Sequence, residues 1–106
     1  MNSMQLVEKE IKEKVKEFLD SIGIRYEEEN FKLKIKGIIE SVDLDIIPHV
    51  SVRIDAFRRI VVEKYLEKTR IMYEPQTPNE HIRDLLINNE KAPKIEYRYG
   101  ELILNF

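Results

Sequence analysis

The amino-acid sequence predicts a single α+β domain over residues 1–106, with a largely antiparallel sheet of five or six strands and two or three helices. Two patterns support this prediction. Apolar residues recur at spacings of three and four from Leu6 to Ile22, which is the period of an amphipathic helix. Apolar and charged residues then alternate from Phe31 to Asp55, which is the period of strands that are buried on one side.

The first predicted element is this N-terminal amphipathic helix of about five turns. Ser3 is suited to cap its start, and Gly23 is suited to end it, because glycine readily adopts the left-handed backbone of a terminal residue. Ile24 is then placed to fold back on Leu19. The apolar stripe consists of Leu6, Val7, Ile11, Val15, Phe18, Leu19 and Ile22.

A lysine-rich strand is predicted for residues 31–36, after a short strand at residues 24–28. Its apolar residues occupy odd positions, whereas those of the next strand, residues 42–46, occupy even positions. A hairpin that turns at residues 40–41 places both sets on one face of the sheet. In that register Lys36 faces Asp45 and Ile35 faces Ile46.

Pro48 lacks the N–H group that a sheet ladder requires. The alternation continues with the same parity through residues 50–54, which favours a bulge or bend in one long strand over a turn at residues 47–49. Asp55 is then placed to cap a second helix over residues 56–70, although the β-branched residues at 60–62 suit a strand as well.

A short strand is expected at residues 71–73, and a helix is expected to start at residues 77–80. These four residues, Thr-Pro-Asn-Glu, combine a capping hydroxyl, a proline in the first turn and a glutamate three residues after the cap. The buried stripe of this helix would consist of Ile82, Leu85 and Leu86.

The chain is predicted to close with a hairpin of residues 95–99 and 102–106, which turns at Gly100 and Glu101. Tyr97 and Tyr99 could stack on nucleic-acid bases. They share the parity of Ile95, however, so we expect them to pack in the core.

Composition excludes several function classes. The 18 Lys and Arg residues and 20 Asp and Glu residues give a net charge of -2, which creates no long-range attraction to nucleic acid or anionic membranes. Cysteine is absent, which excludes disulfides, thiolate nucleophiles and zinc thiolate sites. No apolar run suggests a membrane span or a signal peptide, so we expect a cytoplasmic protein. Abundant Ile, Glu and Lys resemble thermophile usage.

Asp43 and Asp45 are the residues best placed to hold a divalent cation, because they lie two apart on a predicted strand. Metal-dependent nucleases of the restriction-endonuclease-like fold add a second acid followed two residues later by a lysine. Here the nearest candidates, Glu63 and Lys64, are adjacent, so the motif is broken. Pairing of the two aspartates with lysines across the sheet is the favoured interpretation.

Basic residues provide candidate phosphate contacts, but an equal supply of acids favours an ion-paired surface. The two histidines, His49 and His81, have no spacing that indicates a metal or catalytic site. We therefore assign no catalytic residue and expect no cofactor. The candidate phosphate contacts are Arg53, Arg58, Arg59, Arg70, Lys32, Lys34 and Lys36.

Two apolar residues, Ile38 and Ile47, interrupt the charged face of the alternating stretch. In the hairpin register given above they lie close together. They are either covered by a helix, which the number of predicted helices favours, or they form a contact with a second copy of the chain.

The order of helix, three-stranded meander, helix and strands is similar to that of small dimeric secretion-chaperone-like proteins. This resemblance of element order implies a non-enzymatic interaction or assembly module, and we expect a homodimer. The alternative is a nucleic-acid-acting protein, possibly a metal-dependent nuclease, that uses Asp43, Asp45 and Glu63. A small ligand bound between sheet and helix is a third possibility.

Overall fold

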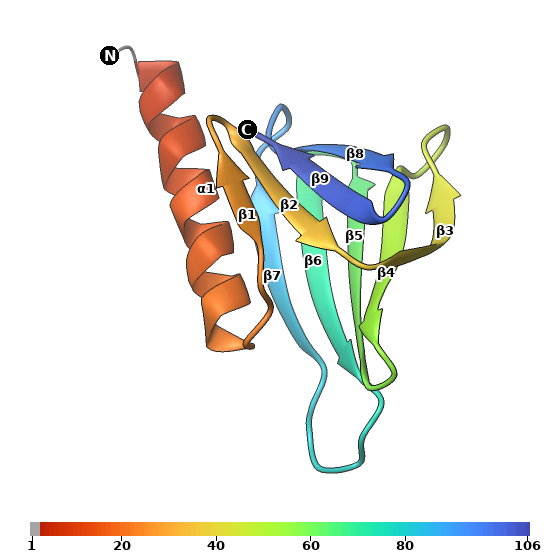
Figure 1. The fold of residues 1–106 in the computed structure, drawn as a ribbon. Coiled ribbons are helices and arrows are strands. Elements are labelled where there is room, and N and C mark those ends of the chain that lie inside the picture. Colours follow the sequence, from red (N-terminus) through yellow and green to blue (C-terminus); the bar gives the residue numbers. More distant parts are fainter. Residues whose placement is uncertain (1–2) are drawn as a thin grey trace.

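The computed structural model describes residues 3–106 as one helix and nine strands, so the α+β class is confirmed (Figure 1). The predicted numbers of two or three helices and five or six strands are wrong. The elements are α1 (Ser3–Ser21), β1 (Glu27–Glu29), β2 (Lys32–Lys36), β3 (Ile38–Asp43), β4 (His49–Asp55), β5 (Arg58–Tyr65), β6 (Lys68–Pro75), β7 (Arg83–Asn88), β8 (Lys94–Arg98) and β9 (Glu101–Asn105).

The strands form two antiparallel sheets, one in the order β1-β2-β9-β8 and one in the order β3-β4-β5-β6-β7. The chain passes from the first sheet to the second at Gly37, between β2 and β3. On the side of the molecule away from this crossing, α1 lies beside β1 and β7 (Figure 1). No helix in the described residues has the length and apolarity that crossing a membrane requires.

One hydrophobic core fills the space between the two sheets and α1. The alternation in the sequence correctly predicts the inward-facing residues Leu33 and Ile35 of β2, which are fully buried. Phe31, in contrast, precedes the strand and stays 63% exposed. Fully buried core residues also include Val15 and Leu19 of α1, Val50, Val52, Ile60, Val62 and Ile71 of the larger sheet, and Leu102 and Leu104 of β9.

The end of α1 has the predicted form. Gly23 has a positive φ of 69°, and the Ile24 N–H donates to the Leu19 carbonyl at 3.0 Å. The Gly23 N–H donates to the Asp20 carbonyl at 3.2 Å, which completes a Schellman motif. Arg58 and Arg83 reach this end from the larger sheet and donate to the carbonyls of Gly23 and Ser21, at 3.1 and 3.3 Å.

The predicted hairpin at residues 40–41 is wrong, because β2 and β3 belong to different sheets. β2 pairs with β1 and β9, whereas β3 pairs with β4. Residues 40–41 lie inside β3, at a bulge between Ile39 and Ser41. The turn comes later, in residues 44–48, so Pro48 ends a loop and does not bend a continuous strand.

The helix predicted for residues 56–70 is also wrong, because this segment forms β5, a tight turn and the start of β6. The β-branched run at 60–62 suits the sheet, where Ile60 and Val62 are fully buried. The Asp55 carboxylate accepts the Phe57 N–H at 2.8 Å, as a helix cap would, but here it stabilises the β4–β5 turn.

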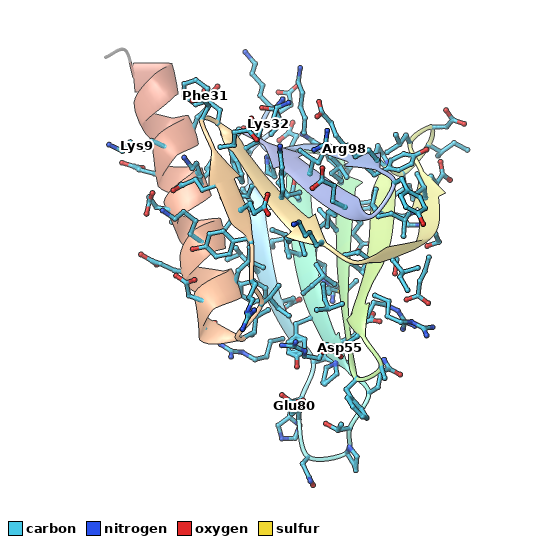
Figure 2. All side chains as sticks on the ribbon, in the orientation of Figure 1. Lys9, Phe31, Lys32, Asp55, Glu80 and Arg98 are labelled. Atoms are coloured by element: carbon cyan, nitrogen blue, oxygen red, sulfur yellow. The ribbon has the colours of Figure 1, made fainter. Side chains whose placement is uncertain are left out.

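The helix predicted to start at residues 77–80 does not form. The Glu80 N–H donates to the Thr77 carbonyl at 3.4 Å, and the Glu80 carboxylate accepts the hydroxyls of Thr77 and Tyr73 at 3.2 and 3.1 Å. These bonds close a single turn in the loop that projects beyond the sheets (Figure 2). The chain then enters β7, where Leu86 is 51% exposed because a strand directs alternate residues outward.

Candidate interaction surface

An open sheet edge is the most distinctive surface of the described residues. β3 is the first strand of the larger sheet, and it pairs with β4 on one side only. Its start is anchored by the Gly37 N–H, which donates to the Gly100 carbonyl at 3.0 Å. Beyond that point its outer edge pairs with no other strand of residues 3–106. Such an edge presents backbone groups that can pair with another chain.

Exposed apolar side chains lie at both ends of this edge. Ile38 at the start of β3 is 68% exposed, and Ile46 in the β3–β4 loop is 89% exposed. Leu44 and Ile47 of the same loop are also exposed. Turn sequences are normally rich in Gly, Pro, Asn, Asp and Ser, so three apolar residues in one short loop are unusual. Contiguous exposed apolar residues mark protein contact sites.

A groove of about 340 Å³ adjoins the start of β3 and is lined by Gly37 and Ile38 together with Tyr97 and Tyr99 of the β8–β9 hairpin. The prediction that both tyrosines are core residues is wrong. Tyr97 pairs with the buried Leu102, as its parity indicates, but it lies on an edge strand and stays 45% exposed. Tyr99 lies in the turn before Gly100 and is fully exposed.

The structure separates the two predicted interface residues. Ile38 begins β3 and Ile47 follows its end, so at least about 17 Å of extended strand lies between them. Among residues 3–106 no helix covers either residue, because α1 lies against the far side of the sheets (Figure 1). The expectation that a helix covers them is therefore wrong, and so is the expectation that they touch within one copy. We define the interaction surface as the β3 edge, the 44–48 loop and the groove at Tyr97 and Tyr99.

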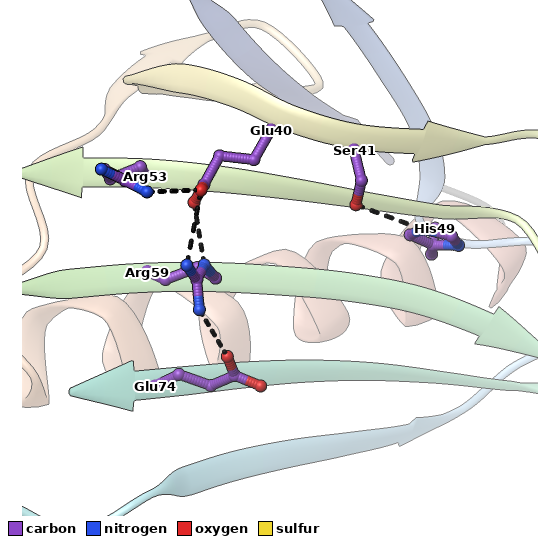
Figure 3. Close-up of polar contacts among 6 residues, drawn as sticks. All are labelled: Glu40, Ser41, His49, Arg53, Arg59 and Glu74. Atoms are coloured by element: carbon purple, nitrogen blue, oxygen red, sulfur yellow. Dashed lines mark hydrogen bonds and ion pairs between the residues drawn. The ribbon is translucent and has the colours of Figure 1, made fainter. Parts of the chain in front are cut away.

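The outer face of the larger sheet carries an ion-paired network (Figure 3). The Glu40 carboxylate accepts hydrogen bonds from Arg59 Nε and Arg53 Nη2, each at 2.8 Å. Arg59 also pairs with Glu74 at 3.4 Å. Hydrogen bonds from Arg59 and Arg53 lower the pKa of Glu40 to about 2, from an ordinary value of 4.5. These two arginines, which were candidate phosphate contacts, are thus engaged by carboxylates.

We expect a Glu40→Gln variant to be less stable than the wild type by about 1 kcal/mol at pH 7, because the glutamine amide lacks the negative charge that binds the two arginines. The folded-state pKa is depressed, so this contribution is complete above about pH 4.5 and is lost as the pH falls toward 2. Urea unfolding at pH 7 and at pH 2 measures it. Glu67→Gln, in the exposed β5–β6 turn, is the control. An equal loss of stability at both pH values would contradict this account of Glu40.

The remaining predicted acids do not converge. Asp43 ends β3 and its carboxylate accepts the backbone N–H of Asp45 at 2.9 Å, so Asp45 lies in the loop and not on the strand. Glu63 lies on β5 and pairs with Arg70 at 3.8 Å. His49 contacts the Ser41 hydroxyl at 3.4 Å. Within residues 3–106, no three His, Asp or Glu side chains lie close enough to hold a metal ion.

Arg58 lies apart from the other candidate arginines. It pairs with Asp55 at 2.8 Å and contacts the end of α1, at the end of the molecule where Asp55 is labelled in Figure 2. Two of the three lysines of the row are also paired, since Lys34 pairs with Glu29 and Lys36 pairs with Glu27, whereas Lys32 takes part in none of the ion pairs of residues 3–106.

Comparison with known proteins finds no match to this chain among protein-family models, curated proteins or solved structures. The interaction surface is therefore interpreted from its own geometry. Sequence reasoning singled out Ile38 and Ile47, which the structure leaves exposed, but it did not anticipate the groove. The available signal was the segment at residues 44–47, which contains three apolar residues and is more hydrophobic than isolated turns usually are.

Proposed function

We propose that this protein is a non-enzymatic assembly module that forms a homodimer by pairing β3 with β3 of a second copy. The observation that supports this most is the apolar loop beside an open sheet edge, with Ile46 89% exposed. Natural proteins usually protect exposed edges with lysine, proline or short strands. β3 is six residues long and contains neither lysine nor proline; of the features that protect an edge it has one bulge, between Ile39 and Ser41.

The residues of β3 favour one register for an antiparallel, two-fold symmetric pair. Ile39 and Val42 face the core, because they pair with the buried Val52 and Val50 of β4. The bulge between Ile39 and Ser41 puts Ile39 and Val42 on the same face, so placing Ile39 opposite Val42 of the second copy brings these residues together at both ends of the contact. Each sheet then continues into the other as one ten-stranded sheet.

The same register avoids charge repulsion between the two strands. Asp43 lies opposite Ile38 of the second copy, and Glu40 lies opposite Ser41, so no two acids face each other directly. The two Glu40 carboxylates approach the symmetry axis, but each is already held by Arg53 and Arg59. The edge therefore accepts a second copy without bringing unpaired charges together.

The apolar loop at residues 44–48 also contacts the second copy in this arrangement. Antiparallel pairing carries the chain from Asp43 past Ile38 of the second copy, toward the groove at Tyr97 and Tyr99. The loop side chains then contact an aromatic surface, and symmetry repeats this contact. Ile38 of one copy and the loop that contains Ile47 of the other copy thus become neighbours.

Cysteine cross-linking tests this geometry, because the natural chain has no cysteine. In the proposed register the two Ser41 Cα atoms lie roughly 6 Å apart beside the symmetry axis, which is within disulfide reach. We expect Ser41→Cys to form a covalent dimer under mild oxidation, as seen by mass spectrometry without reductant. Asn79→Cys, in the exposed loop before β7, is the matched control and should stay monomeric. Cross-linking of neither variant, or of both equally, would contradict the proposed pairing.

A further inference from the structure

A cavity of about 700 Å³ opens at the end of the molecule where α1 ends. Three segments that are distant in sequence form it: the α1–β1 connection, strand β2 and the β4–β5 hairpin. Its lining includes Arg25, Tyr26, Lys34, Lys36, Ile54 and Arg58. It shares no residue with the interaction surface. Its volume lies within the range of roughly 300–1,000 Å³ that is typical of small-molecule sites.

The charge of this lining opposes that of the whole chain. Four cationic side chains and one acidic side chain, Glu27, line the cavity, although the chain as a whole has a net charge of -2. Lys34, Lys36 and Arg58 are paired with Glu29, Glu27 and Asp55, so Arg25 is the cation of this lining that takes part in no ion pair of residues 3–106. Positive side chains that converge on a concave site concentrate the electrostatic potential and attract anions. The cavity therefore offers cationic groups to a small anion.

Arg25 is the residue most available to a ligand. It is exposed and takes part in none of the ion pairs of residues 3–106. Lys36 pairs with Glu27 at 3.0 Å, but both side chains are more than half exposed. Exposed ion pairs of this kind contribute little stability, so Lys36 can exchange its partner for a ligand oxygen.

The other two features of the cavity are an apolar wall and a covered helix end. Tyr26 and Ile54 are partly buried against the core and offer an apolar surface to the ring of a ligand. The carbonyl groups at the end of α1 would repel an anion. Arg58 donates to the Gly23 carbonyl at 3.1 Å, which offsets this repulsion where the helix end borders the cavity.

We propose that this cavity binds a phosphate-bearing small molecule of mononucleotide size. Arg25 and Lys36 contact the phosphate, because guanidinium and ammonium groups are the side chains that best match phosphate oxygens. Tyr26 and Ile54 contact the ring. Binding at this cavity is independent of dimerisation, because the two surfaces have no residue in common.

Titration of the ¹⁵N-labelled full chain with adenosine 5′-monophosphate tests the proposal. We expect amide chemical-shift changes to concentrate at residues 23–27, 34–36 and 54–58. Inorganic phosphate should shift the same amides at higher concentration, whereas adenosine, which lacks the phosphate, should bind much more weakly. Because Arg25 contributes a charge-assisted contact, Arg25→Gln should weaken binding about tenfold.

Lys68→Gln is the matched control, because it removes one positive charge from an exposed turn outside the cavity. It should leave the affinity for the nucleotide unchanged. The proposal is overturned if millimolar nucleotide shifts no amide of the cavity, if adenosine binds as tightly as the nucleotide, or if Lys68→Gln weakens binding as much as Arg25→Gln.

Discussion

A Gly37→Ala variant is expected to lose about 3 kcal/mol of unfolding free energy, which is near the upper end of the effects of overpacking. A Cβ atom at this position would lie 2.5 Å from the Arg53 carbonyl oxygen and 2.6 Å from Cγ2 of Val52. Both distances are far shorter than van der Waals contact. Because Arg53 O belongs to the backbone of β4 and Val52 is fully buried, neither atom can move without disturbing the sheet.

Gly100→Ala is the matched comparison for this prediction. Gly100 has a positive φ of 81°, but a Cβ atom there would meet no atom within 4 Å. The expected loss is about 1 kcal/mol, from the left-handed backbone alone. Urea unfolding of both variants measures the difference. Equal losses would show that the close approach at Gly37, where the chain crosses between the sheets, does not constrain the fold.

An Ile46→Glu variant is expected to dissociate the proposed homodimer. Ile46 is 89% exposed within one copy, so the substitution should leave the unfolding free energy of the monomer unchanged. In the dimer it would place a carboxylate against the aromatic groove, at about 2 kcal/mol for each copy. A two-fold symmetric dimer contains this contact twice, so the penalty doubles and the dissociation constant should rise about a thousandfold.

Leu66→Glu is the control for Ile46→Glu. Leu66 is 81% exposed in the β5–β6 turn, outside the interaction surface. It should leave the dissociation constant unchanged, as measured by sedimentation equilibrium. If both variants weaken association equally, general hydrophobicity and not the β3 surface drives it.

The sequence was informative about features that depend on residues close together in the chain. Parity along residues 31–36 correctly places Leu33 and Ile35 in the core, and Gly23 correctly ends α1. Parity does not identify the neighbouring strand, however. β2 pairs with β9, about 70 residues later, and no local pattern contains that information.

The wrong helices have a common physical cause. The Asp55 carboxylate accepts a hydrogen bond and the Thr77 hydroxyl donates one to groups nearby in the chain. Such side chains form these bonds in turns as readily as at helix starts. The residues that follow decide between the two outcomes. After Asp55 the β-branched run at 60–62 favours a strand, and burial between neighbouring strands outweighs the helical spacing.

The candidate interaction surface was only partly predictable. The apolar character of Ile38 and Ile47 marked them, because neither residue suits a charged face. Their separation could not be predicted without knowing that β2 and β3 lie in different sheets. The tyrosines of the groove share the parity of a core residue, and only their place on an edge strand and in a turn exposes them.

The mass of the wild-type chain in solution tests the central claim most directly. Sedimentation equilibrium over a range of concentrations, at neutral pH and moderate salt, distinguishes the two states without any substitution. The proposed function predicts a particle of twice the chain mass of 12.7 kDa, which dissociates on dilution according to a single monomer–dimer equilibrium. A particle of 12.7 kDa at every concentration, up to the highest that stays in solution, would contradict it.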